Sequence, residues 1–199
     1  NEHPDKLHTV GKPVPNCDIR LLDENGQEVA PGAVGEIVGR SPTMMAGYFG
    51  RDDLTDAYIW RDSAGHVFFR SGDMGRFDED GFLILSDRKK DMIISGGFNV
   101  YPRNIEEAIY QHPSVEEVSV IGIKDEYRGE APKAFIKLKA GASGFTLDEL
   151  KEFLKDKLGK HEMISDMDIR AELPKTLVGK LSKKELYEEE EKKLAAKAA

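Results

Sequence analysis

Cysteine is nearly absent from this 199-residue chain, which contains Cys17 alone. A single cysteine excludes an internal disulfide and a cysteine pair with metal-ligand spacing. The chain also lacks an apolar run of about eighteen residues, so we expect no transmembrane segment. Its first residues do not show the charged region and apolar stretch of a secretion signal. These absences fit a protein of a reducing, cytoplasmic compartment.

An excess of positive charge is missing as well, because the formal net charge is −8. Without a dominant positive field, the chain is not expected to bind nucleic acid or anionic membranes in a generic way. Any phosphate ligand must therefore be held by a local group. Hydrophobic residues make up 39% of the chain, which is enough for a packed core. The chain begins at Asn1 without a methionine, which we interpret as a cut within a longer protein.

The first part of the chain, residues 10–87, shows short alternating segments separated by turns. Aspartate-led turns that end in glycine occur at residues 23–26, 62–65 and 78–81. Glycine supplies the positive φ that such turns require, and each turn is followed by apolar or aromatic residues typical of strands. This part is therefore predicted to be mostly β.

From about residue 88 the pattern changes, and we place a domain boundary there. Pro102 can begin a helix because its missing N–H is not needed in the first turn, and Ile105, Ala108 and Ile109 share one face of that helix. Strands are predicted at residues 115–123 and 134–138.

Two later helices carry capping-box spacing at their starts. Thr146 and Glu149 begin a helix whose leucine stripe ends at Gly159, and Ser182 and Glu185 begin a final helix. The tail past Glu190 is expected to fray. The second part of the chain is thus predicted to mix helices with strands.

Two segments carry charged side chains suited to a nucleotide. Residues 69–73 (FRSGD) present Asp73 on a glycine turn, where its carboxylate could accept hydrogen bonds from two vicinal hydroxyls. Residues 87–91 (DRKKD) place Arg88, a planar donor for ribose or phosphate, next to Lys90 at the domain boundary. Taken alone, the first segment is more typical of an aspartate that caps its own turn, and the second of a solvated charge cluster.

Two further segments combine glycine with exposed or cationic positions. Residues 95–99 (SGGFN) end an apolar strand with Gly96 and Gly97. Because both residues lack a Cβ atom, a ligand chain could lie against their backbone. A plain tight turn is the alternative interpretation. Residues 173–180 (LPKTLVGK) form a proline-led loop that ends at Lys180, whose ammonium suits oxyanions. The loop lacks the glycine spacing of a Walker motif, and alone it is more typical of a solvated lysine.

Together and in this order, the four segments resemble the adenylate-forming superfamily of acyl-CoA synthetases, luciferases and peptide-synthetase adenylation domains. The resemblance covers nearly the whole chain, because residues 10–13, 31–37 and 47–49 are similar to further motifs of that family. Two departures are Ser71, where threonine is usual, and residues 160–165, which lack a frequent proline. In this family a carboxylic acid and ATP give an acyl-adenylate and pyrophosphate, and CoA then displaces AMP to form a thioester.

The resemblance implies a role for each charged candidate. Asp73 matches the aspartate that binds the ribose hydroxyls of ATP, and Arg88 matches an arginine that also contacts the nucleotide. Lys180 matches the catalytic lysine that contacts the acid carboxylate and the α-phosphate during adenylation, where it stabilises developing negative charge.

The resemblance also implies a domain rotation between the two half-reactions. Lys90 matches the hinge position, and rotation about it removes Lys180 from the reacting groups. The same movement brings residues 95–98 to the site, where Gly96 and Gly97 line the channel for the pantetheine arm of CoA.

The family's organisation implies where the domains lie. Residues 1–87 correspond to the end of the large AMP-binding domain, its β-barrel subdomain, and residues 88–199 to the mobile C-terminal domain, with the hinge near 88–91. The expected fold class is α+β, a β-rich barrel-like subdomain followed by a small α/β domain with a mixed sheet flanked by helices. The phosphate loop, the acyl pocket and the glutamate that helps to hold Mg²⁺ are expected upstream of Thr9, so the isolated chain is expected to be inactive.

The full-length parent is expected to be an acyl-CoA ligase that uses ATP, CoA and Mg²⁺ with a medium- or long-chain fatty acid. An aryl acid is the alternative substrate, because residues 95–102 resemble both fatty-acid and aryl-acid ligases. A peptide-synthetase domain is disfavoured, since no carrier-domain serine motif follows Lys180. A non-catalytic fragment that binds nucleotide or CoA is a further alternative. No nucleic-acid partner is expected, and peripheral membrane contact through the acyl substrate is an alternative to a purely cytoplasmic enzyme.

Overall fold

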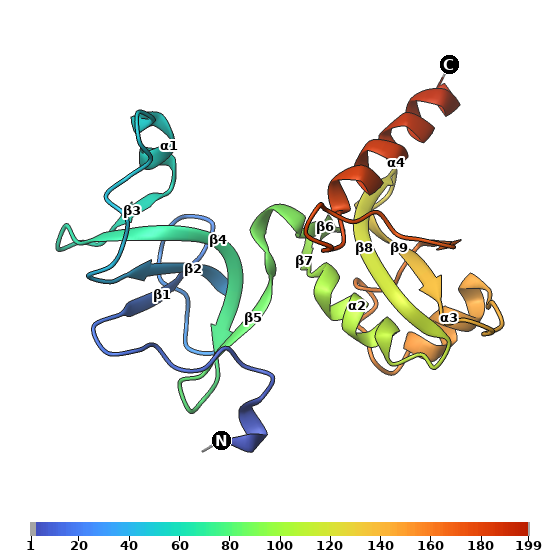
Figure 1. The fold of residues 1–199 in the computed structure, drawn as a ribbon, viewed down its shortest axis with the longest axis horizontal. Helices are drawn as coiled ribbons and strands as arrows, with labels where there is room; N and C mark the ends of the chain where they lie inside the picture. The colour runs from blue at the N-terminus through green and yellow to red at the C-terminus, as the bar shows by residue number, and fades with distance from the viewer. Residues whose placement is uncertain (1–2, 199) are drawn as a thin grey trace. The chain divides into compact units, whose positions relative to one another are not determined.

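The computed structural model describes residues 3–198 and divides after Lys90 into two compact units. Within its described residues, the first unit, which ends at Lys90, contains a short 3₁₀ turn, one helix and five strands, with a second 3₁₀ turn at its boundary (Figure 1). These elements are η1 (Pro4–Lys6), β1 (Asp18–Leu22), β2 (Gly35–Arg40), α1 (Asp52–Ala57), β3 (Ile59–Arg61), β4 (Val67–Phe77), β5 (Leu83–Arg88) and η2 (Lys89–Asp91).

The second unit, from Asp91 onward, contains three helices and five strands among the described residues. In chain order they are β6 (Ile93–Ser95), β7 (Phe98–Val100), α2 (Pro102–Tyr110), β8 (Val115–Asp125), β9 (Gly129–Leu138), α3 (Leu147–Leu154), β10 (Asp166–Arg170) and α4 (Lys183–Ala198).

The sheet of the first unit is antiparallel and open. Its strand order is β1-β2-β4-β3, and β5 pairs with the second half of the long strand β4. Leu21, Ile37 and Leu83 pack in one buried cluster, so the sheet curves enough to bring residues of β1, β2 and β5 together. Nevertheless, no strand pairing between described residues joins β1 to β3 or β5. The expected barrel-like subdomain is therefore corrected to a curved open sheet, because hydrogen bonding does not close it.

The sheet of the second unit is mixed, as predicted. The long strands β8 and β9 pair antiparallel, and β10 pairs parallel to β9 over residues 133–137. The short hairpin β6-β7 adjoins the beginning of β9, where Ser95 lies opposite Gly129. Strand β9 thus has β8 along one side, and β6 and β10 in succession along the other.

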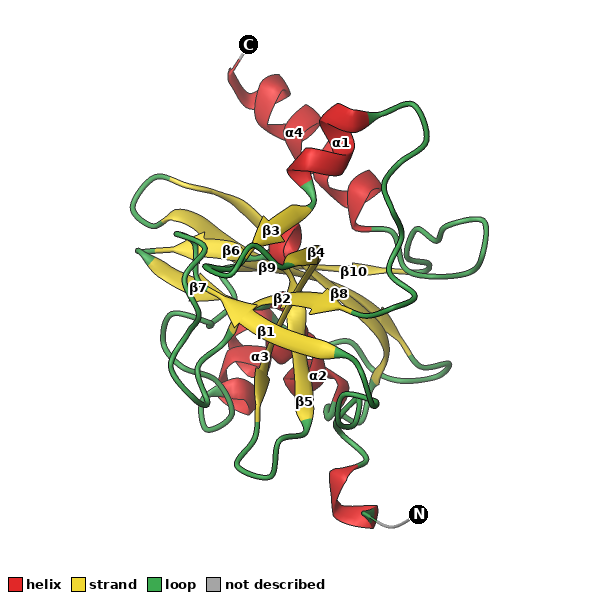
Figure 2. Ribbon diagram, turned by 90° about the vertical axis from the view of Figure 1, so that its left-hand side faces the viewer, coloured by secondary structure: helices red, strands yellow, loops and turns green. Residues whose placement is uncertain are grey.

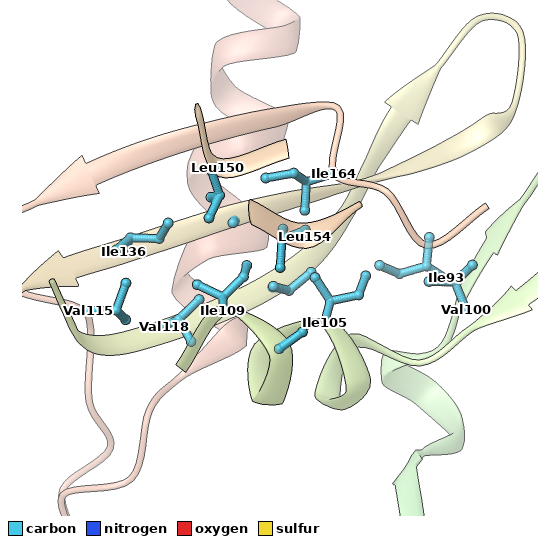
Figure 3. Packing of buried hydrophobic residues seen from close by; sticks show 13 residues of the cluster. Ile93, Val100, Ile105, Ile109, Val115, Val118, Ile136, Leu150, Leu154 and Ile164 are labelled. Carbon is cyan, nitrogen blue, oxygen red and sulfur yellow. The ribbon is translucent and has the colours of Figure 1, made fainter. Parts of the chain in front are cut away.

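The main core of the second unit lies between this sheet and the helices α2 and α3 (Figure 3). The predicted helix face is confirmed, because Ile105, Ala108 and Ile109 of α2 are buried. Burying each large aliphatic side chain contributes about 1.5–3 kcal/mol. The buried members of this cluster are Ile93, Val100, Ile105, Ala108, Ile109, Val115, Val118, Val120, Ala134, Ile136, Leu150, Leu154 and Ile164.

The opposite face of the sheet is covered by α4. Leu186 of α4 packs with Ile121 of β8, Phe135 of β9 and Leu173 in a second buried cluster. Figure 2, turned from the first view, shows α4 on one side of β8 and β9 and α2 and α3 on the other. The second unit is therefore a three-layered arrangement of helix, sheet and helices.

The α+β class is confirmed, with a β-rich first unit and a mixed sheet flanked by helices in the second. The helix that we expect to fray past Glu190 continues to Ala198, which corrects that expectation. Within residues 3–198, none of the helices is long and apolar enough to cross a membrane.

Candidate functional site

Asp73 and Arg88 lie opposite each other on adjacent strands of the first unit. The register of β4 and β5 pairs the two residues, and Asp73 Oδ1 lies 3.5 Å from Arg88 Nε. Their side chains are 38% and 65% exposed, so both charged groups remain accessible. The arrangement presents an acceptor carboxylate beside a planar donor, which suits a ligand with vicinal hydroxyls and a nearby phosphate.

The backbone at Asp73 is held by the serine at the position where threonine is usual. Ser71 Oγ donates to the carbonyl of Ile37 at 2.8 Å and accepts the N–H of Asp73 at 3.0 Å. A hydroxyl suffices for both bonds, so the exchange of threonine for serine retains this support.

A buried glutamate connects the strands around this pair. Glu36 of β2 accepts hydrogen bonds from Arg70 at 2.7 Å and from Lys89 at 2.9 Å. Burial opposes the charge of Glu36, but the two cations outweigh it, so the pKa of Glu36 lies below its ordinary value. Lys89 precedes the proposed hinge residue Lys90, whose own side chain is exposed. Glu36 therefore fixes the segment that leads to the end of the first unit.

In the second unit, Gly96 and Gly97 form the two-residue turn of the β6-β7 hairpin. Their φ angles are +58° and +82°, the pair of positive values that a tight hairpin favours. The N–H of Gly96 donates to the carbonyl of Arg128 at 2.8 Å, which ties the turn to the sheet. A Cβ at either position would have no atom within 4 Å, so the turn presents open, bare backbone.

Lys180 lies near the end of a second hairpin, residues 174–182, which we call the lysine hairpin. The N–H of Thr176 donates to the carbonyl of Lys180 at 2.7 Å, and Lys180 N–H donates to Thr176 Oγ1 at 3.2 Å. Lys175 and Leu181 pair as an antiparallel bridge below this turn. Lys180 is exposed on a tightly hydrogen-bonded loop, which suits a cation that must meet an external oxyanion.

The glycine turn and the lysine hairpin are anchored at opposite ends of β9. The glycine turn adjoins Gly129 at the start of that strand. Lys175 instead forms an ion pair of 2.6 Å with Glu117, close to the register position of Lys137. Gly129 and Lys137 are separated by eight residues of extended strand, about 26 Å. One unit therefore carries two distinct exposed segments.

The structure thus brings Asp73 and Arg88 together and anchors Gly96, Gly97 and Lys180 separately. The sequence interpretation gave no role to Glu36 or Glu117. An acidic residue next to buried apolar positions of a strand is the available signal for each, because such a residue requires a cation when buried. The partners themselves lie far away in sequence. Among the described side chains, no group of three or more His, Cys, Asp or Glu could hold a metal ion.

Two family models match the chain. The model of the AMP-binding enzyme matches residues 1–49, and that of the AMP-binding enzyme C-terminal domain matches residues 104–180.

Curated relatives and solved structures match over most of the chain. A long-chain-fatty-acid–CoA ligase of Bacillus subtilis (strain 168) is 44% identical over 93% of this chain and 32% of its own length. A 2-succinylbenzoate–CoA ligase of Bacillus cereus (strain ATCC 14579) is 39% identical over 91% of this chain and 36% of its own length. The structure of ATP-bound MatB from Rhodopseudomonas palustris is similar with a TM-score of 0.82 at 32% identity, over 91% of this chain and 35% of that one.

The chain spans about a third of the length of these relatives. A further long-chain-fatty-acid–CoA ligase, of Salmonella typhimurium (strain LT2), is 41% identical over 100% of this chain and 34% of its own length, so that match includes the segments that hold Asp73, Arg88, the glycine turn and the lysine hairpin. The order of these segments, the two family models and the identities of about 40% agree with one another. This chain belongs to the adenylate-forming, AMP-binding enzyme superfamily and is similar to its acyl-CoA synthetases.

Proposed function

We propose that the chain is the C-terminal part of an AMP-forming acid–CoA ligase. In the first half-reaction, the acid carboxylate attacks the α-phosphate of ATP and pyrophosphate leaves. In the second, the CoA thiol attacks the acyl carbon, AMP leaves and the thiol proton is released. The observation that carries the proposal is the Asp73–Arg88 pair, at 3.5 Å in a chain 44% identical to a long-chain-fatty-acid–CoA ligase.

Asp73 and Arg88 are proposed to hold the nucleotide. The Asp73 carboxylate would accept hydrogen bonds from the ribose hydroxyls, and the Arg88 guanidinium would donate to the nucleotide beside it. Their exposure supports this proposal, since neither charged group is sealed inside the sheet. The ion pair keeps the two side chains close together before a ligand arrives.

Lys180 and the glycine turn are proposed to serve different half-reactions. The ammonium of Lys180 would stabilise negative charge at the carboxylate and α-phosphate during adenylation. Gly96 and Gly97 would face the pantetheine arm during thioester formation, where missing Cβ atoms permit close approach. Anchoring of the two segments at opposite ends of β9 supports the division. We propose that rotation about Lys90 exchanges them. Lys90 lies in the hinge segment 88–91, at the start of the mobile domain 88–199, which follows residues 1–87 of the large domain.

A medium- or long-chain fatty acid is the proposed substrate, and the Bacillus subtilis relative supports it. An aryl acid is the second candidate, because the chain is also 39% identical to a 2-succinylbenzoate–CoA ligase. ATP, CoA and Mg²⁺ are the proposed cofactors, with the Mg²⁺ ligand outside this sequence. We place the enzyme in the cytoplasm, with peripheral membrane contact through the acyl substrate as the alternative, which fractionation of cells would distinguish.

Acid-dependent exchange between ATP and pyrophosphate tests the proposal directly. The full-length parent should exchange with hexadecanoate or octanoate, and less with benzoate or 2-succinylbenzoate. Exchange with the aryl acids alone would transfer the assignment to the second candidate, and no exchange with any acid would contradict the ligase function. The 199-residue chain alone should show none, because the phosphate loop and the acyl pocket are proposed to lie outside it. Robust exchange by the chain alone would refute that part of the proposal.

A further inference from the structure

The lysine hairpin is attached to the second unit at its base. Leu173 is buried against Ile121 and Phe135, and Leu181 packs on the same cluster. The N–H of Ser182 donates to the carbonyl of Pro174 at 2.8 Å, which closes the base of the hairpin. Beyond this base, Leu177 and Val178 are almost fully exposed. The tip that precedes Lys180 therefore has no apolar support of its own.

One ion pair connects the hairpin beyond its base to the sheet. Lys175 Nζ lies 2.6 Å from Oε1 of Glu117, and the two residues are 58 positions apart. The Glu117 side chain is 22% exposed and that of Lys175 38%. Lys175 pairs with Leu181, the residue after Lys180, in an antiparallel bridge. A change in the position of Lys175 would therefore also move the backbone next to Lys180.

The other oxygen of Glu117 makes this pair asymmetric. Oε2 of Glu117 is buried and has no hydrogen-bond partner among the described residues. The nearby lysine of β9, Lys137, is instead paired with Glu116 and Glu172. Among the described residues, Lys175 is the cation paired with Glu117, so removal of Lys175 would leave a partly buried carboxylate without a counter-charge.

We propose that Glu117 and Lys175 are positioning residues that fix the lysine hairpin so that Lys180 meets the reacting groups during adenylation. The inference rests on the function proposed above for Lys180. Neither residue touches substrate in this account. They act through the backbone of Lys180 and through the backbone N–H and the hydroxyl of Thr176, whose hydrogen bonds with Lys180 fix its position relative to residue 175.

The kinetic test uses the full-length parent with Lys175→Met, Glu117→Gln and the double variant. Each single variant should lower kcat for adenylation about ten- to a hundredfold, because a misplacement of about 1 Å can have an effect of that size. Thioester formation from supplied acyl-adenylate should be unchanged, as should KM for ATP. Since one pair is removed in every case, the double variant should lose no more than a single one. Lys175→Arg, which keeps the cation, should retain most of the activity.

Lys184→Met is the matched control, because Lys184 is an exposed lysine of α4 with only a distant partner, Glu188 at 3.8 Å. It should leave both half-reactions unchanged. Equal loss of both half-reactions in Lys175→Met, or additive losses in the double variant, would overturn the positioning role. A thermal melt identifies any variant that has unfolded, and Glu117→Gln then carries the test, since it leaves no unpaired carboxylate.

Hydrogen exchange separates this inference from the proposed function. In Glu117→Gln, the amides of Thr176, Gly179 and Lys180 should exchange faster, while those of β8 and β9 should not change. Unchanged exchange in the hairpin would overturn the anchoring, whatever the enzyme does. If Lys180→Ala lowered both half-reactions equally, the role proposed for Lys180 would be refuted, whereas the ligase function itself is refuted only if the wild-type parent shows no acid-dependent exchange. If Lys180→Ala separated them and Lys175→Met did not, only the positioning role would be refuted.

Discussion

Asp73 shows how the surroundings of a single residue change its interpretation. In the sequence alone, an aspartate after Ser71 and Gly72 is typical of a turn that caps itself. In the structure, the N–H of Asp73 is bonded to Ser71 Oγ, and its carboxylate is directed to Arg88 instead. The carboxylate of Asp73 is therefore paired with a neighbouring strand and stays 38% exposed.

Replacing Asp73 with asparagine tests the nucleotide role at the scale of one side chain. Asp73→Asn keeps the shape but removes the charge, and a hydrogen bond to a charged group contributes about 1.5–3 kcal/mol. The variant of the full-length parent should therefore bind ATP about tenfold more weakly or worse. Equilibrium titration with a fluorescent ATP analogue measures the change, with Glu79→Gln as an exposed acidic control. Wild-type affinity in Asp73→Asn would contradict the assignment.

Glu36 gives a pH-dependent prediction. Its pKa lies below the ordinary value of 4.5, because the hydrogen bonds from Arg70 and Lys89 outweigh the opposing effect of burial. The ion pairs of Glu36 therefore stabilise the folded state fully above pH 4.5, and this stabilisation is lost as the pH falls through the lowered pKa of Glu36 in the folded state. Glu36→Gln should reduce the free energy of unfolding at neutral pH by about 2 kcal/mol.

Urea unfolding at neutral pH and at a pH well below 4.5 measures this difference. The difference between Glu36→Gln and wild type should shrink in acid, because the wild-type carboxyl is then protonated as well. A difference that is constant with pH would show that packing, and not the charge of Glu36, stabilises the first unit.

Among the secondary-structure elements, a helix or strand is predicted well where a sequence pattern within a few residues specifies it. An element whose order depends on pairing with a distant segment is not predicted. The capping box of Thr146 and Glu149 is confirmed with both of its hydrogen bonds. Strand β10 was not predicted, because its order comes from parallel pairing with β9, more than thirty residues earlier. Helix α1 was also missed, since it is short and has no buried residue to produce a periodic pattern. The end of α4 remains helical with contacts such as Lys193 to Glu190 at 2.7 Å.

The glycine hairpin permits a matched comparison of stability with function. Gly97 and Gly141 have φ angles of +82° and +77°, and a Cβ at either would meet no atom within 4 Å. Alanine at each should therefore destabilise its turn to a similar extent, about 1 kcal/mol. Only Gly97→Ala should slow thioester formation from acyl-adenylate, because only that turn is proposed to face pantetheine. Equal thioester rates in the two variants would count against the channel assignment.

At the scale of the whole molecule, the identities of the candidate residues were accessible from sequence, and their anchoring was not. The order of Asp73, Arg88, the glycine pair and Lys180 was sufficient to indicate the family. The attachment of the glycine turn at Gly129 and of the lysine hairpin at Glu117 depends on the register of β8 and β9, which no local pattern specifies. Strand pairing is also what decides whether the first sheet closes, so the sequence alone did not show that the expected barrel is a curved open sheet.

Lys90 tests the proposed exchange of the two segments. Lys90→Pro restricts the backbone at the boundary after which the second unit begins, because proline fixes φ. Adenylation by the full-length variant should persist, while thioester formation should fall strongly. A rapid-quench measurement of each half-reaction checks this. Lys90→Ala is the control, because it removes the side chain without restricting the backbone. An unaffected second step in a folded Lys90→Pro variant would remove the hinge assignment.

The proposed role of Lys180 in adenylation can be checked by measuring both half-reactions of Lys180→Ala in the full-length parent. Acid-dependent exchange between ATP and pyrophosphate should fall by at least about a hundredfold, the loss expected when a preorganised charge is removed. Thioester formation from supplied acyl-adenylate and CoA should continue at the wild-type rate. Equal loss of both half-reactions in a variant with an unchanged thermal melt, or retention of full exchange, would contradict it.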